Sequence, residues 1–267
     1  MDGEPINQTL IQPTLDALGF DWHYRAETGS TNADALQHYL HHGRDVVAFA
    51  ESQTAGRGRR GRQWLSPFAR NIYCTVGINR RIRAANQGLL SIVTGVALCR
   101  ALRAQTGLAV RLKWPNDLLL DGRKLGGILI ESRVLGDGCF FFAIGFGLNL
   151  FMSVEELACL DRPATSLSQA LAQTSAQELD RNALLVASIE AVIAANRSFE
   201  IDGLSALMND FTDLDAYHET PVEVVCGEQR ITGINRGIDE TGQLRLETNR
   251  GIELFSAAEI SLREAGA

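Results

Sequence analysis

Apolar residues recur with helical spacing at several places in the first two hundred residues. Leu89, Ile92, Val93 and Val96 keep i, i+3, i+4, i+7 spacing, which predicts an amphipathic helix over Gln87–Gln105. Comparable patterns, with Gly19 as a stop signal and Asp180 as an N-cap, predict four more helices. These helices are expected near Asn7–Leu18, Asn32–His41, Asp180–Phe199 and Gly203–Leu214.

Short apolar runs bounded by turn residues alternate with these helices and predict strands. They lie at Phe20–Glu27, Val46–Glu51, Asn71–Ile78, Ala109–Lys113, Leu118–Leu120, Leu125–Val134 and Cys139–Ile144. Asp121-Gly122 and Asp137-Gly138 are typical turns of β-hairpins, and Thr31 with Asp34 fits a capping box. Mixed helices and hairpins predict an α+β domain with a mixed sheet.

The pattern changes after Tyr217, where short strands follow one another with glycine-containing turns between them. Strands are expected at Pro221–Cys226, Arg230–Asn235, Gln243–Glu247 and Ile252–Phe255. This spacing predicts a small β-barrel. We therefore expect two domains, 1–217 and 218–267.

Composition narrows the class of protein. The chain has 267 residues, 45% of them apolar, and a net charge of −7, which disfavours general nucleic-acid binding. No signal peptide and no apolar run long enough to span a bilayer is evident, so we expect a cytoplasmic protein without a membrane partner. The five cysteines are scattered beside apolar stretches and are expected to be buried thiols.

The segment Gln53–Trp64 carries the densest chemistry of the chain. Seven consecutive residues from Gly56 to Arg62 contain four arginines and three glycines. Glycines let a backbone approach a ligand, and guanidinium groups bind carboxylate or phosphate oxygens. Although a solvated basic turn is the usual alternative, the flanking strands favour a flexible loop that closes over an anionic ligand.

A second candidate is the hairpin around Lys124. A hairpin lysine is usually solvated, but Gly126-Gly127 weakens an apolar strand and suggests close approach of a ligand. Asn116-Asp117 has an equally good explanation as turn chemistry. His38, His41 and His42 have the spacing of metal ligands, yet a solvated helix end explains them better.

These motifs resemble those of bacterial biotin protein ligases, the biotin–[acetyl-CoA-carboxylase] ligases. The similarity rests on Gln53–Trp64, Lys113-Trp114-Pro115-Asn116-Asp117 and Arg123–Leu129. Further matches are Ser30-Thr31-Asn32, Gly145–Asn149, Gly233–Asp239 and Glu259–Leu262. The resemblance implies a mixed-sheet catalytic domain, shared with lipoate ligases, followed by an SH3-like barrel.

The same resemblance implies two chemical steps. The carboxylate of biotin attacks the α-phosphate of ATP to form biotinyl-5′-AMP, and a lysine of biotin carboxyl carrier protein then attacks this anhydride. The catalytic residues implied are Lys124 and Arg59. Biotin contacts are implied for Ser30, Thr31, Asn32, Gln53, Arg57, Gly58, Arg59, Lys124, Gly126, Gly127 and Leu129. Nucleotide contacts are implied for Arg62, Trp64, Lys113, Asn116, Asp117 and Asn149.

Mg²⁺ is expected to bridge the phosphates, with Asn116 or Asp117 as its contact on the protein. Of the two, we predict Asp117 as the metal ligand. Leu150–Ala164 matches the family poorly, so the residues that cover the adenine stay open. About thirty residues precede Ser30, so the DNA-binding domain of some relatives is expected to be absent. Alternative functions are a lipoate or octanoate ligase or transferase, a biotin-responsive repressor and a non-catalytic binding module. We also predict a homodimer.

Overall fold

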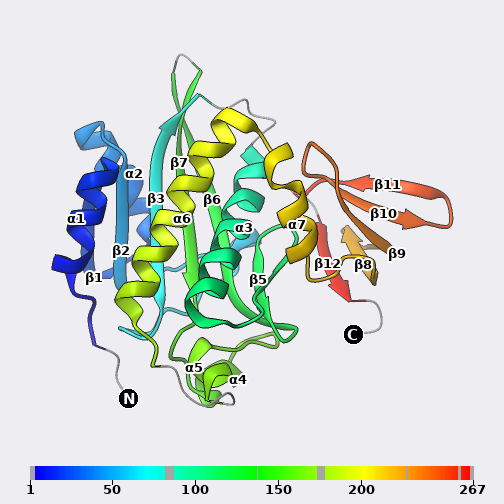
Figure 1. The fold of residues 1–267 in the computed structure, drawn as a ribbon, viewed down its shortest axis with the longest axis horizontal. Coiled ribbons are helices and arrows are strands. Elements are labelled where there is room, and N and C mark those ends of the chain that lie inside the picture. The colour runs from blue at the N-terminus through cyan, green and yellow to red at the C-terminus, as the bar shows by residue number, and fades with distance from the viewer. Residues whose placement is uncertain are drawn as a thin grey trace.

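A mixed seven-stranded sheet forms the centre of the larger part of the molecule (Figure 1). The computed structural model describes residues 4–81, 87–136, 138–172, 178–226, 228–257 and 260–264. The strand order is β1-β2-β3-β7-β6-β5-β4, in which only β1 and β2 run parallel. The strands are β1 (Asp21–Thr28), β2 (Val46–Gln53), β3 (Ile72–Arg80), β4 (Arg111–Lys113), β5 (Asp117–Leu120), β6 (Arg123–Gly136) and β7 (Cys139–Leu148).

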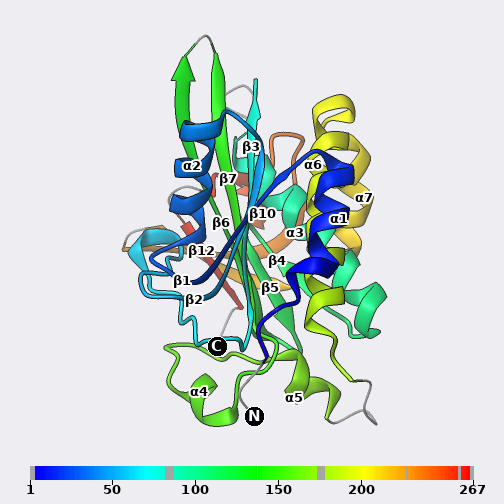
Figure 2. The ribbon, with the colours of Figure 1, turned by 90° about the vertical axis from the view of Figure 1, so that its left-hand side faces the viewer.

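Helices cover the two faces of this sheet unequally (Figure 2). One face carries α1 (Gln8–Leu18), α3 (Gln87–Thr106), α6 (Arg181–Asp202) and α7 (Met208–Leu214). These helices enclose the main core, which includes Ile72, Phe142 and Ile144 of the sheet. The opposite face carries α2 (Thr31–His42), which buries a smaller apolar cluster against β2 and β7. Two short helices, α4 (Val154–Ala158) and α5 (Leu167–Leu171), follow β7.

The face of α2 contains a strip of glycines beyond the N-terminus of that helix. Successive strand residues point to opposite faces, so Gly145 and Gly147 lie on this face while Ile144 and Phe146 point into the main core. Gly127 pairs with Gly147 across β6 and β7. The sheet therefore presents bare backbone at this end, which makes room for the candidate site.

A five-stranded antiparallel sheet follows α7, in agreement with the small barrel expected from the sequence. Its order is β11-β10-β9-β8-β12. The strands are β8 (Pro221–Cys226), β9 (Gln229–Ile238), β10 (Leu244–Thr248), β11 (Gly251–Phe255) and β12 (Ile260–Glu264). The fully buried Trp114 joins the two sheets, because its indole N–H donates to the Gly242 carbonyl (3.0 Å). The boundary between residues 217 and 218 stays our proposed division.

Some local expectations were wrong. Ser30, not Thr31, is the N-cap of α2 and makes no side-chain capping bond. Thr31 is drawn instead into tertiary hydrogen bonds with Gln53 and Thr75. The predicted capping box therefore does not form, because long-range partners outcompete a local one.

Strand β7 continues through Gly145–Leu148, although glycines made a strand end at Ile144 the expectation. Hydrogen bonding to β3 and β6 on both sides outweighs the low strand propensity of glycine. Helices α4 and α5 and strand β12 were not predicted, and β4 begins at Arg111 rather than Ala109. The Asp137-Gly138 turn lies partly outside the described residues.

The cysteine prediction holds for two of the five residues. Cys74 and Cys99 are buried, whereas Cys139 and Cys226 are half-buried and Cys159 is exposed. Cys159 is exposed although apolar residues flank it in sequence, because it stands at the C-terminal end of the short helix α4. Among the described helices, none is both long and apolar enough to cross a membrane.

A buried ion pair fixes the start of α6 against the sheet. Arg181 Nη2 lies 2.6 Å from Glu51 Oε2, and the two side chains are 6% and 0% exposed. The same guanidinium donates from Nε and Nη2 to the Asn71 carbonyl (3.0 and 2.7 Å). Glu51 Oε1 accepts from the Ile6 amide (2.8 Å), so the pair also anchors the N-terminal segment.

We expect Arg181→Met to destabilise the fold by about 3–5 kcal/mol, because it leaves the Glu51 carboxylate buried without its cation. Arg100→Met is the matched control, since Arg100 pairs with Asp210 at the surface and its loss should cost roughly 0–1 kcal/mol. Urea denaturation of both variants measures the difference. Equal costs for the two substitutions would contradict the anchoring role of Arg181.

Candidate active site

The indole of Trp64 lies on the glycine strip. A Cβ placed on Gly147 would stand 2.5 Å from Trp64 Cε2, and one on Gly127 would stand 3.4 Å from Trp64 Cζ3. Any side chain at Gly147 would therefore displace the indole. The indole thus covers this part of the strip, with its N–H buried and without a partner among the described residues.

Lys124 enters this site from the start of β6. Its Nζ lies 5.4 Å from the Trp64 ring centroid and would be 3.2 Å from a Cβ on Gly127. Nζ donates to Asp117 Oδ1, and only 16% of the lysine side chain is exposed. Burial lowers the pKa of Lys124, while the Asp117 carboxylate opposes this change by favouring the ammonium form.

The backbone of Lys124 is held from a second direction. Its N–H donates to the Pro163 carbonyl (3.0 Å), and its carbonyl accepts from the Thr165 amide (2.9 Å). The loop after α4 thus extends alongside Lys124. Asn149 supports the same loop, because its side-chain amide donates to the Thr165 carbonyl (3.1 Å).

Arg59 links the glycine-arginine loop to two other parts of the chain. Its Nη1 donates to Asn116 Oδ1 (2.9 Å), and its Nη2 donates to the Ala257 carbonyl, which follows β11 of the C-terminal sheet. Burial lowers the pKa of the Arg59 guanidinium, as do the nearby positive charges of Arg60 and Arg62. The loop itself is closed by a hydrogen bond from the Gly58 amide to the Arg62 carbonyl (2.7 Å).

A hydrogen-bonded chain crosses the far end of the site. The Thr75 hydroxyl lies 2.7 Å from Asn32 Oδ1 and 2.8 Å from Thr31 Oγ1. Asn32 Oδ1 can only accept, so Thr75 donates to it, and the Thr31 hydroxyl also has Gln53 Oε1 as an acceptor (3.3 Å). Asn32 Nδ2 then donates to the Leu129 carbonyl (3.2 Å) and to Glu131 Oε2 (2.8 Å).

Glu131 continues this chain into the glycine-arginine loop, where it accepts from Arg57 Nη2 (3.0 Å). Gln53 adds a branch, since its Oε1 accepts from the Thr31 amide (3.0 Å) and its Nε2 donates to Ser66 Oγ (3.2 Å). Hydroxyl and amide groups, together with the Arg57–Glu131 ion pair, therefore line this end without net charge, while Lys124 and Arg59 make the other end cationic.

The structure thus brings together most of the predicted site residues. Ser30 precedes Thr31 at the start of α2, and Gly126 packs against the Gly147 carbonyl, which leaves Gly127 as the glycine that faces Lys124. Arg62 is exposed at the loop base. Lys113 pairs with Asp117 across β4 and β5, and its Nζ lies 5.7 Å from the Tyr217 ring centroid.

The predicted metal contacts, Asn116 and Asp117, are both engaged by other groups of the protein. Asp117 Oδ1 is engaged by Lys124, and its Oδ2 faces Arg162 (4.0 Å). Within the described ranges, no three His, Cys, Asp or Glu side chains form a group that could hold an ion. Asn116 is also committed, because its Nδ2 donates to the Ile128 carbonyl (2.8 Å).

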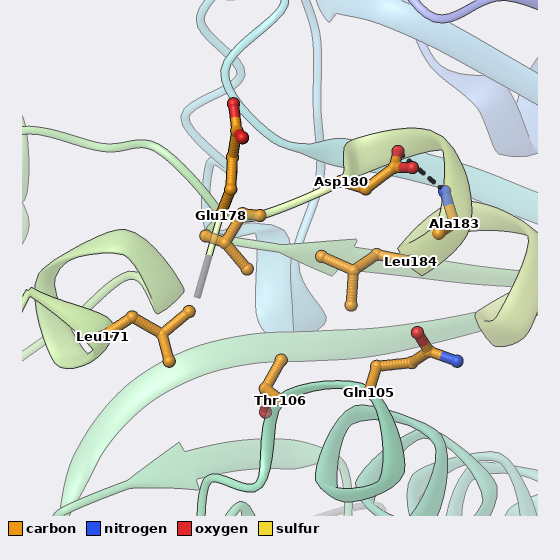
Figure 3. A pocket seen from close by; sticks show the side chains of 8 residues that line it. Gln105, Thr106, Leu171, Glu178, Asp180, Ala183 and Leu184 are labelled. Atoms are coloured by element: carbon orange, nitrogen blue, oxygen red, sulfur yellow. Dashed lines mark hydrogen bonds between the residues drawn. The ribbon is translucent and has the colours of Figure 1, made fainter. Parts of the chain in front are cut away.

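Two cavities elsewhere do not include the predicted site residues. One, of about 60 Å³, lies between the end of α3, α5 and the start of α6. There the N-cap Asp180 accepts a hydrogen bond from the Ala183 amide (Figure 3). The other, of about 390 Å³, lies on the C-terminal sheet between β8, β9 and β10. Over the glycine strip, the Trp64 and Lys124 side chains themselves occupy the nearby space.

Three residues of the site were missed by sequence reasoning. Thr75 and Glu131 follow the two-residue alternation that places them on the same face as the glycines, so the strand pattern could have revealed them. Arg162 gave no such signal, because it lies in an irregular loop. Thr75 adds a hydroxyl to the hydrogen-bonded chain, Glu131 adds an anion and Arg162 adds a cation.

Comparison with known proteins gives the same assignment at the level of families. Residues 26–149 match the biotin/lipoate A/B protein ligase family, and residues 218–263 match the biotin protein ligase C-terminal domain. The bifunctional ligase/repressor BirA of Escherichia coli is 38% identical over 82% of this chain, which spans 67% of the length of that protein.

Two further relatives match over nearly their whole length. Biotin protein ligase from Aquifex aeolicus, solved in complex with biotin and ATP, superposes with a TM-score of 0.77 at 26% identity, covering 92% of this chain and 99% of that one. Biotin–[acetyl-CoA-carboxylase] ligase of Paracoccus denitrificans is 33% identical over 88% of this chain and 98% of its own length. By this extent of similarity, the chain belongs to the biotin protein ligases of the biotin/lipoate A/B protein ligase family.

Proposed function

We propose that this protein uses ATP to ligate biotin to a specific lysine of biotin carboxyl carrier protein, through biotinyl-5′-AMP. The observation that carries the proposal is the position of Lys124, a largely buried ammonium between Asp117 and the glycine strip. The relatives support it, since one was solved with biotin and ATP and another is named for acetyl-CoA carboxylase.

The first step must bring two anions together. The biotin carboxylate attacks the α-phosphorus of ATP, the P–O bond to the β-phosphate breaks, and pyrophosphate leaves. Lys124 and Arg59 supply fixed positive charge for the carboxylate, the phosphate and the charge that grows in the transition state. Because both cations are partly desolvated, their effect on the reacting oxygens is stronger than in water.

The neutral end of the site suits the uncharged ring system of biotin. Thr31, Asn32 and the Leu129 carbonyl offer donors and acceptors for the ureido group, with Ser30 and Gln53 beside them. Gly127 of the glycine strip would let flat rings approach the sheet backbone, and Gly126 stays a proposed backbone contact. Arg57 and Gly58 would close the loop over the ligand, and Glu131 would hold Arg57 in place.

The nucleotide would lie on the side of Lys124 and Trp64. Arg62, Lys113, Asn116, Asp117 and Asn149 stay candidates for its contacts, with Lys113 requiring a turn away from Tyr217. Magnesium would arrive with ATP as part of the substrate and neutralise phosphate charge. In the second step, the amine of the carrier lysine attacks the biotinyl carbonyl, AMP leaves, and the amine loses a proton.

The decisive experiment is biotin-dependent ATP–pyrophosphate exchange, followed by transfer of label to a purified carrier domain. We expect exchange with biotin and labelling at one carrier lysine. Exchange only with lipoate or octanoate would favour the alternative activity of the same fold. Light scattering with and without biotin tests the predicted homodimer separately.

Lys124→Ala is expected to slow adenylate formation by roughly 10²–10⁴-fold, because it removes charge stabilisation from the transition state. Arg123→Ala is the matched control, since it removes a positive charge from the adjacent residue of the same hairpin. Single-turnover adenylation measures both, and circular dichroism checks the fold. Near-normal adenylation by Lys124→Ala would show that another group is the essential cation.

Arg59→Gly should release the intermediate early, because Arg59 ties the loop to Asn116 and Ala257. We expect faster dissociation of biotinyl-5′-AMP and biotinylation of a bystander such as serum albumin. Arg60→Gly is the control, because it adds a glycine to the same loop at a residue whose φ is already +60°. If Arg59→Gly loses adenylation but releases no faster, Arg59 acts in catalysis rather than in retention.

A further inference from the structure

Arg162 lies at the cationic end of the site although the sequence pattern left its loop unassigned. The neighbouring residues Pro163 and Thr165 both hydrogen-bond to the backbone of Lys124. These contacts place Arg162 beside the start of β6, and Pro163 restricts its backbone further. Its side chain is 28% exposed, so it is partly buried yet accessible to a ligand.

Two cations converge on one carboxylate at this point. Lys124 donates to Asp117 Oδ1, and Arg162 Nη1 lies 4.0 Å from Asp117 Oδ2. Lys124, Arg162 and Asp117 together carry one positive charge. The exposed Asp161 carboxylate offsets part of it, whereas Arg62 adds to the positive charge that acts on Lys124. Such an excess of positive charge beside a bare glycine strip favours an anion.

We propose that Arg162 binds phosphate oxygens of the nucleotide together with Lys124. The inference rests on the proposed function and adds a residue to it. A guanidinium presents parallel N–H groups to phosphate, and its reach complements the single ammonium of Lys124. Arg162 would thus bind the phosphates from the loop after α4, whereas Arg59 belongs to the glycine-arginine loop.

A simpler role for Arg162 is a surface ion pair. Its Nε donates to Asp161 Oδ1 (3.1 Å), and Asp161 is 75% exposed. Pairs of this kind contribute little to stability. A surface ion pair would also leave the affinity for ATP unchanged. The two roles therefore predict different affinities for ATP when Arg162 is substituted.

The test compares KM for ATP, KM for biotin and the inhibition constant of adenosine in the exchange assay. For Arg162→Ala we expect KM for ATP to rise about tenfold and KM for biotin to stay unchanged. The inhibition constant of adenosine should also stay unchanged, because adenosine lacks phosphate. The KM for ATP of Arg162→Lys should lie between the values of Arg162→Ala and the parent. Asp161→Asn and Arg133→Ala, an exposed residue of β6, should match the parent.

Three results would overturn the inference. KM for ATP could stay unchanged in Arg162→Ala, or adenosine could weaken as much as ATP, which would indicate a loss of loop structure. Asp161→Asn could also reproduce the effect of Arg162→Ala, which would assign it to the ion pair. Absence of biotin-dependent exchange in the parent protein would instead defeat the proposed function.

The scarcity of lysine carries a second inference independently. Of the 25 lysines and arginines in the sequence, only Lys113 and Lys124 are lysines. Lys124 is largely buried, and Lys113 lies over the Tyr217 ring. The exposed cations of the glycine-arginine loop are Arg57, Arg60 and Arg62.

We infer that this arginine-only loop protects the enzyme from acylation by its own intermediate. An anhydride such as biotinyl-5′-AMP reacts with a neutral amine, which attacks the carbonyl carbon, expels AMP and loses a proton to water. Lysine reaches the neutral amine form, whereas a guanidinium stays protonated and does not react. This inference also rests on the proposed function.

Arg60→Lys tests it by placing an amine on the exposed loop, with Arg133→Lys as the control on β6. Each protein is incubated with biotin and ATP without carrier, and intact mass spectrometry with peptide mapping counts the biotin groups. We expect no label on the lysines of the parent and several-fold more label at position 60 than at position 133. Label on parent Lys113, or equal labelling at both introduced amines, would refute the inference even if exchange is normal.

Discussion

The candidate site depends on keeping one ammonium group charged in a largely enclosed place. Burial lowers the pKa of Lys124 and favours the neutral amine, and the Asp117 carboxylate partly offsets that effect. This requirement explains why β5 and β6 form a tight hairpin, which sets Asp117 and Lys124 seven residues apart on neighbouring strands. It also explains why the loop at residues 163–165 is bonded to the same backbone.

The remaining architecture supplies the space around that charge. A helix on only part of one sheet face leaves the glycines of β6 and β7 uncovered, and Trp64 closes over them. The C-terminal sheet is coupled to this region twice, through Trp114 to Gly242 and through Arg59 to Ala257. A change in its position would therefore reach the glycine-arginine loop directly.

The sequence carried the mixed fold, most strands and the identity of the main cation, because these follow from periodicity and from unusual residue combinations. Local rules failed where distant partners decide. Thr31 could cap its own helix but bonds to Gln53 and Thr75, and β7 accepts glycines because two neighbouring strands hold it. Arg162 could not be found, since only the folded loop brings it to Asp117.

A crystal structure with biotin and a non-hydrolysable ATP analogue would test the central claim most directly. Our account predicts the biotin rings on the glycine strip near Thr31 and Asn32, and Lys124 Nζ within hydrogen-bonding distance of both the carboxylate and the α-phosphate. Ligands bound with Lys124 still paired only to Asp117 and touching neither anion would contradict it.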